Sequence, residues 1–366
     1  MLRFLFRFLL FVIALGLIAL AVGPLLVDPS PAPGATSAKA VARPESRFVD
    51  IPFAGTDGIG LHFLEQAGSL PAGSLPEGQD QVAAPTTTPA AIQHTASAPS
   101  QPGAPTFVLL HGFTFNAFTW NQLLAAFAAH GRVVAYDQIP YGLSAKLMPG
   151  TWTGENPYSK AAAREQLFAF MDSLGIERAI LVGNSSGGTL ALEAALSEPD
   201  RIQALILLAP WVHANRPIFP DWLAQLPQTR RLTLLLARYL GGDSPLLDHS
   251  YADPTRIDDE RRALTGIHRE MANWDVAWGA LLNHSLTDPV EISAHLAEVK
   301  QPVLVVAGAM DQVVPVADSE ATAAELPNAQ FRLLPYCGHV PQEECPAQVA
   351  DAVSSWLRTL PEASPR

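Results

Sequence analysis

Short, mostly apolar runs recur along this chain and constrain its fold more than any other feature. They cover residues 107–110, 132–136, 179–182, 204–208, 302–306 and 331–334, and most of them lead into a polar or glycine-containing turn. Strands with almost no polar positions are buried on both faces, which is typical of a parallel sheet that helices cover on both sides. The pattern therefore predicts an α/β fold with a mostly parallel central sheet.

Helical patterns separate the apolar runs. We expect helices at 121–130, at 161–174, at 189–196, around Ala321 and at 349–360. The alternation stops after Trp211, where a long segment is rich in leucine and tryptophan and has no strand pattern. We therefore predict an α/β core formed by residues 46–211 and 290–360, with residues 212–289 inserted as a helical cap.

Residues 1–27 are predicted to be a transmembrane anchor or a signal sequence. Residues 8–27 form an apolar run without a charge, preceded by Arg3 and Arg7. About 20 such residues span a bilayer, and positive flanks stay on the cytoplasmic side. A cleaved signal is the alternative, because small residues near residue 21 provide cleavage sites. In both cases we expect the catalytic part to lie outside the cytoplasm, either membrane-anchored or secreted.

Three further segments separate this leader from the first apolar run of the core. Residues 28–45 are rich in proline and alanine, and we expect a linker that holds the domain off the bilayer. Short apolar runs at 47–51 and 61–64, with glycines between them, predict a β-hairpin. Residues 67–104 contain few large apolar side chains, so we predict a disordered insertion.

Charge and cysteine content exclude several classes of protein. The 366 residues carry a formal net charge of −12, and no cluster of five or more basic residues occurs. Such a surface repels phosphate backbones, so we expect no nucleic-acid partner. Two cysteines are too few for a disulfide scaffold or a cysteine-based zinc module. Cys337 and Cys345 could pair outside the cytoplasm, but the favoured interpretation is two unpaired, small apolar residues.

Most of the histidines show no pattern of metal ligands. None of them forms a His-x-x-x-His pair with a nearby carboxylate, so we predict no metal site and no cofactor. Surface positions are the default expectation for this group, which comprises His62, His94, His130, His213, His249, His268, His284 and His295.

Candidate catalytic residues follow three of the predicted strands. Ser185 lies in the sequence Gly183-Asn184-Ser185-Ser186-Gly187, between a strand and a helix, which is the context of a nucleophile elbow. A serine hydroxyl needs a neighbouring base, and His339 follows the last strand. Asp311 follows the preceding strand and is the candidate carboxylate that orients the histidine. The order Ser, Asp, His along the chain is that of α/β-hydrolases.

An acyl-transfer site also needs backbone N–H groups that bind the oxyanion. The residue after the nucleophile, Ser186, supplies one amide. The second is expected from the loop after His111-Gly112, where Phe113 is the candidate and Thr114 the fallback. Asp137 also ends a strand, but that strand is more remote, so we interpret Asp137 as structural.

With these motifs the chain resembles the α/β-hydrolase superfamily, in its epoxide-hydrolase-like branch. The resemblance covers residues 48–360 except the low-complexity insertion. It rests on His111-Gly112-Phe113, 137–142, 183–188, 311–315 and Gly338-His339. Epoxide hydrolases and haloalkane dehalogenases of this fold carry aspartate at the elbow, where this chain has Ser185. The resemblance therefore implies serine-hydrolase chemistry through an acyl-enzyme, without a cofactor.

The leading hypothesis is a membrane-tethered serine hydrolase that cleaves carboxylic esters of apolar small molecules. The aromatic, leucine-rich cap favours an apolar substrate group. Alternatives with the same triad are hydrolysis of a carbon–carbon bond in vinylogous diketones and perhydrolysis. A catalytically silent ligand-binding module on a hydrolase fold is the alternative from a different class.

Overall fold

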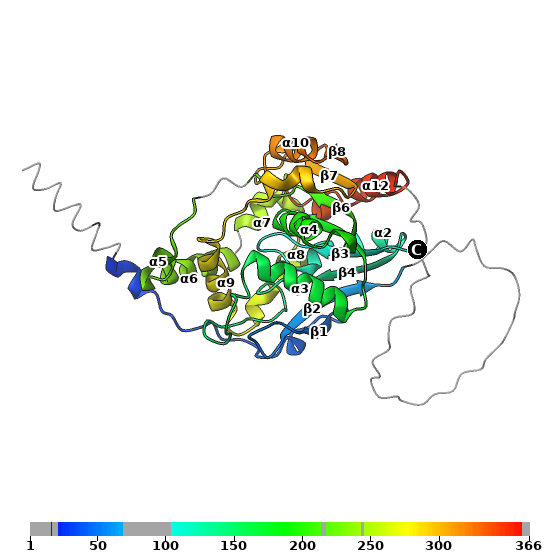
Figure 1. Cartoon of the computed structure of the whole chain (residues 1–366). Coiled ribbons are helices and arrows are strands. Elements are labelled where there is room, and N and C mark those ends of the chain that lie inside the picture. Colours follow the sequence, from blue (N-terminus) through cyan, green and yellow to red (C-terminus); the bar gives the residue numbers. More distant parts are fainter. Residues whose placement is uncertain (1–15, 17–20, 69–103, 214–216, 243–244, 361–366) are drawn as a thin grey trace, which may run out of the picture.

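A computed structural model describes Gly16 and residues 21–68, 104–213, 217–242 and 245–360 (Figure 1). The described residues contain one eight-stranded sheet in the order β1-β2-β4-β3-β5-β6-β7-β8. The strands are β1 (Arg47–Ile51), β2 (Ile59–Gln66), β3 (Thr106–Leu110), β4 (Arg132–Tyr136), β5 (Ala179–Asn184), β6 (Ile202–Leu208), β7 (Val303–Gly308) and β8 (Ala329–Leu334). This is the α/β-hydrolase fold that the sequence predicted.

Six strands of the sheet run parallel, and one hairpin closes its first edge. β1 and β2 pair antiparallel, as predicted, and β2 also pairs antiparallel with β4. All later pairs, from β4–β3 to β7–β8, are parallel. Every residue of β5 and β7 is buried. Alternate side chains of β5 enter two apolar clusters on opposite faces, Leu181 in one and Val182 in the other.

Helices cover both faces of the sheet. Those that follow core strands are α2 (Leu124–Ala128), α3 (Lys160–Ser173), α4 (Ser186–Ser197), α10 (Val316–Glu325), α11 (Pro341–Glu344) and α12 (Pro346–Leu357), with short 3₁₀ turns η3 (Ala117–Trp120), η4 (Pro199–Arg201) and η7 (Ile292–Glu298). The predicted helix over 121–130 is wrong in its limits. Within that range only Leu124–Ala128 (α2) is α-helical, and the chain before it forms the 3₁₀ turn η3, in which Asn116 accepts Phe118 N–H.

A helical insertion lies between β6 and β7, as predicted. It contains α5 (Asp221–Ala224), α6 (Pro227–Gly241), α7 (Pro245–Ser250), η5 (Pro254–Arg256), α8 (Asp259–Thr265), η6 (Ile267–Glu270) and α9 (Trp274–Ser285). Figure 1 shows α5, α6 and α9 as one group at the end of the molecule away from β8 and α12.

The N-terminal segment packs on this insertion. It contains η1 (Gly23–Leu26) and η2 (Ala38–Ala40). The Arg238 side chain on α6 donates to the carbonyls of Asp28 and Ser30, and Ala32 N–H donates to Asp275. These bonds fix residues 28–32 to the surface of the insertion, so the first part of the predicted linker follows the domain, and its role in holding the domain off the bilayer stays a prediction.

Two predictions concern residues that are almost entirely outside the described part of the chain. The predicted disordered insertion, 67–104, overlaps the described residues only at its two ends. The predicted leader, 1–27, is described only at Gly16 and residues 21–27. Within the part of the chain that is described, no helix has both the length and the apolar character needed to cross a bilayer. The leader therefore stays a prediction.

Candidate active site

Ser185 stands at a sharp turn between β5 and α4. Its backbone adopts φ 53° and ψ −120°, a left-handed conformation that is uncommon for a residue with a side chain. Its N–H donates to Leu208 O, and its carbonyl accepts from the N–H groups of Gly188 and Trp211. A Cβ at Gly187 would lie 2.2 Å from Leu110 O, so this tight turn needs glycine there. This backbone geometry is typical of a nucleophile elbow, and the role of Ser185 as the nucleophile stays a prediction.

Asp311 and His339 form a buried pair. His339 Nδ1 and Asp311 Oδ2 are 2.9 Å apart. The other oxygen of Asp311, Oδ1, accepts the backbone N–H groups of Val313 and Val314 at 2.8 and 2.9 Å. With Oδ1 held in this way, Oδ2 accepts the Nδ1–H of the imidazole. His339 Nε2 is then the nitrogen that remains for proton transfer.

Hydrogen bonds from two sides place His339 beside the elbow. Asn184, the residue before the serine, donates its side-chain amide to His339 O at 3.0 Å. On the other side, His339 N–H donates to Ser250 O at the end of α7 (2.7 Å). The structure thus joins the histidine to its carboxylate and ties its backbone to the neighbour of Ser185.

Phe113 N–H is oriented by the residue pair before it. Burial lowers the pKa of His111, so the ring is neutral, and its Nε2 accepts the backbone N–H of Gln138. His111 Nδ1–H therefore donates to Gly112 O at 2.8 Å. In a trans peptide the N–H points opposite to the carbonyl, so the N–H of Phe113 points away from His111. Ser186, the other predicted oxyanion donor, is the first residue of α4.

A cavity of about 420 Å³ contains Ser185, Ser186 and Phe113 in its wall. Most of the wall is apolar or aromatic, and it comes from the core strands, from α3 and α4, and from α9 of the insertion. Its apolar and aromatic side chains include Tyr136, Ile139, Tyr141, Leu281 and Leu282. A cavity of this size takes a small organic molecule.

Charged groups gather at another part of the cavity wall. Lys160 Nζ and Asp288 Oδ1 form an ion pair at 2.9 Å, and Glu193 lies in the same wall. Burial opposes ionisation of Asp288, but hydrogen bonds and charge from Lys160 outweigh it and lower the pKa of the carboxyl. Burial raises the pKa of Glu193. The cavity therefore joins an apolar region to a polar one.

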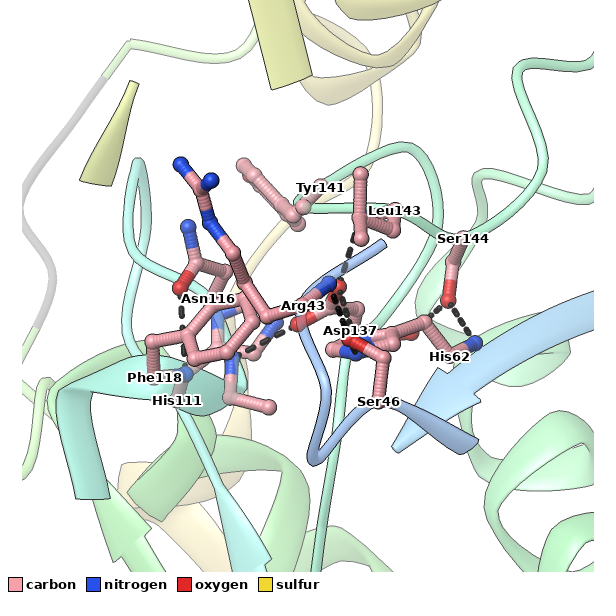
Figure 2. A network of polar contacts seen from close by, with 12 residues as sticks. Arg43, Ser46, His62, His111, Asn116, Phe118, Asp137, Tyr141, Leu143 and Ser144 are labelled. Atoms are coloured by element: carbon pink, nitrogen blue, oxygen red, sulfur yellow. Dashed lines mark hydrogen bonds and ion pairs between the residues drawn. The ribbon is translucent and has the colours of Figure 1, made fainter. Parts of the chain in front are cut away.

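Asp137 anchors the loop that forms one wall of the cavity (Figure 2). Its Oδ1 accepts Ala117 N–H, and its Oδ2 accepts Leu143 N–H and contacts His62 Nδ1 at 2.8 Å. Burial alone would raise the pKa of Asp137, but the charge of His62 and these hydrogen bonds hold it at about 2. The interpretation of Asp137 as structural agrees with these contacts, since it holds residues 138–141 in place.

Two features beside the site were not predicted from the sequence. Glu344 is buried and accepts the N–H groups of Gly338, Ala252 and Asp253, so it ties the histidine loop to the insertion. Cys337 and Cys345 form a disulfide around the same loop, with Cα atoms 6.1 Å apart. The expectation that they are unpaired is wrong, because the turn between them brings the two thiols together. In the sequence, only the pair Glu343-Glu344 between the two cysteines pointed to these features.

The expectation of surface positions is also wrong for two histidines. His62 is buried between β1, β4 and Ser46, where its Nε2 lies 2.9 Å from Ser46 Oγ. His268 is buried against Trp278, with ring centroids 4.4 Å apart. Burial lowers the pKa of His268 to about 3, so this ring is neutral. Both histidines pack in the interior.

One group in the described part of the chain has the spacing of a metal site. It consists of Cys337, Glu344 and Cys345. The two sulfurs are joined to each other, and Glu344 accepts three backbone N–H groups. These residues do not fit a metal, because their donor atoms are already engaged.

Comparison with known proteins places the chain in a family. The alpha/beta hydrolase fold family matches residues 105–346, so the chain belongs to that family. RutD of Stutzerimonas stutzeri, whose name assigns it to carbamate hydrolysis, is 28% identical over 65% of this chain and 86% of its own length. A 2-hydroxymuconate semialdehyde hydrolase of Pseudomonas putida is 29% identical over 62% of this chain and 76% of its own length.

Solved structures agree on the fold. A crystal structure of a membrane phospholipase A superposes with a TM-score of 0.57 and 20% identity, covering 98% of this chain and 98% of the other. At that identity the likeness shows the fold alone. The resemblance to α/β-hydrolases that the sequence indicated is confirmed.

Proposed function

We propose that this protein is a membrane-tethered serine hydrolase that cleaves carboxylic esters of apolar substrates through an acyl-enzyme. One observation carries the proposal: Ser185, in an elbow conformation, lies in the wall of a largely apolar cavity beside Phe113 and Ser186. Residues 212–289 act as the cap, since Leu281 and Leu282 of α9 contribute to that wall. The apolar wall receives the acyl group, and the oxyanion faces the two amides.

The proposed reaction needs only side chains and amides of this chain. Ser185 Oγ attacks the ester carbonyl while His339 Nε2 takes its proton, and the imidazolium then protonates the leaving alcohol. Asp311 stabilises the charged imidazole through Nδ1. The amides of Phe113 and Ser186 bind the oxyanion, and each such donor contributes about 3–4 kcal/mol in comparable sites. Water activated by His339 then releases the acid.

The proposal is tested by covalent labelling of the full chain with a fluorophosphonate. Wild type should be labelled and Ser185→Ala should not. Ser186→Ala is the matched control, because it removes the adjacent hydroxyl and keeps the backbone amide, so it should be labelled. Labelling of Ser185→Ala would place the nucleophile elsewhere, and absence of labelling in folded wild type would favour a silent binding module.

A second candidate reaction is hydrolysis of a carbon–carbon bond, which the name of the Pseudomonas putida relative suggests. The same serine and histidine would act on a vinylogous diketone. Turnover of 2-hydroxymuconate semialdehyde should be measured beside a series of p-nitrophenyl esters. A kcat/KM that is higher for 2-hydroxymuconate semialdehyde than for every ester would replace the ester proposal.

We also propose that the leader places the catalytic domain outside the cytoplasm, with secretion after cleavage as the alternative. The support is the charge-free apolar run at 8–27 behind Arg3 and Arg7. Expressed at full length, the chain should sediment with membranes and be digested by protease added to spheroplasts. Release of a shortened chain to the medium would favour the cleaved signal.

A further inference from the structure

One side of the helical insertion exposes an unusual number of large apolar side chains. On α6, they project at a spacing of three or four residues, as Leu232, Leu235, Leu236 and Tyr239. The opposite side of α6 is also apolar, with Leu234 and Ala237 buried against the insertion. A helix that is apolar on both sides is normally covered on both sides. The exposure of the apolar side chains on the outer side of α6 therefore indicates that something covers them.

The exposed surface continues onto neighbouring elements. Trp222 on α5 is 65% exposed, and Leu226 lies between α5 and α6. From the N-terminal segment, Val22, Leu25 and Leu26 add further exposed apolar groups, and Leu26 is 82% exposed. Figure 1 shows η1, α5 and α6 side by side, and η1 packs on α6. We call this surface, formed by residues 22, 25, 26, 222, 226, 232, 235, 236 and 239, the α6 face.

The chain itself indicates what covers the α6 face. The charge-free apolar run 8–27 ends within it, at residues 22–27. Gln228 donates to Ala21 O, and Arg231 donates to Val27 O, so the end of the run is fastened to α6. The bonds from Arg238 to Asp28 and Ser30 leave little slack between the run and the domain. If the run inserts into a bilayer, these bonds hold the α6 face next to the point of insertion.

We propose that the α6 face lies in the interfacial layer of the bilayer into which the leader inserts. Its composition fits this position, because tryptophan and tyrosine favour the boundary between hydrocarbon and water. Trp222 and Tyr239 supply such groups. The inference extends the proposed tether from the leader to a folded surface of the domain.

The α6 face is also connected to the cavity. Phe219 N–H donates to Leu286 O, and Asn283 on α9 donates to Ala224 O at the end of α5. Leu281, Leu282 and Ser285 of the same helix line the cavity. A bilayer at the α6 face therefore lies on the far side of the helix that forms the cavity wall. An apolar ester dissolved in the bilayer is the substrate source that this arrangement favours.

The test places a fluorophore on each of two equally exposed leucines. Leu235 on the α6 face is 49% exposed, and Leu333 on β8 is 46% exposed. The chain's two cysteines are paired, so Leu235→Cys and Leu333→Cys each give a unique thiol for the dye NBD. The labelled full chains are reconstituted in vesicles of phosphatidylcholine and phosphatidylglycerol, with and without brominated phosphatidylcholine. Bromine quenches only a dye that reaches the acyl region.

We expect NBD at 235 to be quenched about twofold or more, since interfacial helices bury their apolar face about 5–10 Å deep. NBD at 333 should not be quenched. A blue-shifted emission at 235 without bromine quenching would overturn the proposal and assign the face to a second copy of the chain. Equal quenching at both positions, or none, would also overturn it. Flotation of the vesicles reports the tether separately, and fluorophosphonate labelling reports the catalytic proposal separately.

A second measurement uses activity and rests on the proposed ester hydrolysis. The triple variant Leu232→Ser/Leu235→Ser/Tyr239→Ser should lose about tenfold in turnover of an ester embedded in vesicles, equivalent to about 1.4 kcal/mol. Its turnover of a water-soluble short-chain ester should stay unchanged, because these residues lie outside the cavity. Leu333→Ser is the control. An equal loss on both substrates would contradict the proposed role of the face.

Discussion

In the sheet, Ser185, Asp311 and His339 each follow a strand, so their positions are set by where β5, β7 and β8 end. In the helical insertion, the groups that reach the same site belong to turns and helix interiors, such as Ser250 O, Ala252 N and Leu281. The strand ends supply reactive groups on a rigid frame. The insertion supplies hydrogen bonds that hold one loop and side chains that shape the cavity. Under the proposed function, the sheet carries the reacting groups, and the insertion positions the histidine loop and shapes the cavity.

The largest expected effect tests the part played by the sheet. Asp311→Asn should lower kcat for ester hydrolysis by about 10⁴-fold, because an amide at Oδ2 favours the wrong imidazole tautomer. KM and the urea midpoint should change much less. Single-turnover kinetics on the full chain would measure the loss. Asp318→Asn on α10, outside the site, is the control, and a similar loss there would contradict a specific role of Asp311.

The second prediction tests the hydrogen bonds by which Glu344 connects the histidine loop to the helical insertion. Glu344→Gln replaces one oxygen that accepts N–H groups by an amide that donates, and it should destabilise the protein by about 1–3 kcal/mol. Because the histidine loop loses its anchor, kcat should fall while KM stays near the wild-type value. Urea denaturation and steady-state kinetics measure both effects. Glu298→Gln, at an exposed position, should change stability by less than about 0.5 kcal/mol.

The contacts of Asp137, which anchors the loop in the cavity wall, predict that the stability of the fold depends on pH. The carboxyl of Asp137 has a folded-state pKa of about 2 against an ordinary value of 3.8, so its ionised form stabilises the fold. The contribution is roughly 2 kcal/mol, present above the unfolded-state pKa and lost as the pH falls through about 2.

At pH 7 the free energy of unfolding of Asp137→Asn should therefore be lower than that of wild type by at least this amount. The gap should narrow as the pH falls from about 4 toward 2. Urea denaturation at several pH values gives the curve, and Asp57→Asn, at an exposed position, should follow wild type. A gap that stays constant down to pH 2 would contradict the stabilisation by the ionised carboxylate.

The smallest expected effect tests the selectivity assigned to the insertion. Leu281→Trp narrows the cavity and should lower the ratio of kcat/KM for long over short acyl esters about tenfold, a typical effect of filling an apolar pocket. Leu236→Trp, on the exposed side of α6, is the matched control and should leave the ratio unchanged. An unchanged ratio in Leu281→Trp would mean that the insertion does not set acyl-chain selectivity.

Much of the fold followed from local patterns. Runs such as 179–182 are apolar at every position, so they had to lie in a covered parallel sheet, and Gly183, Gly187 and the strand before Ser185 marked the elbow. The disulfide of Cys337 with Cys345, the burial of His62 and His268, and the short helix after Asn116 did not follow. Each of these depends on contacts with residues that are distant in the sequence or on the shape of one turn, which periodicity does not encode.

The sequence by itself determined the order of strands and helices, the position of Ser185 between β5 and α4, and the positions of Asp311 and His339 after later strands. These features are local, because burial pattern and turn residues act over a few neighbouring positions. Only the tertiary structure decided that Asp311 holds His339 at 2.9 Å, that Glu344 ties the histidine loop to the insertion, and that residues 28–32 are bound to α6 and α9. Hydrogen bonds between distant segments form only when the whole chain has packed, so no local sequence pattern predicts them.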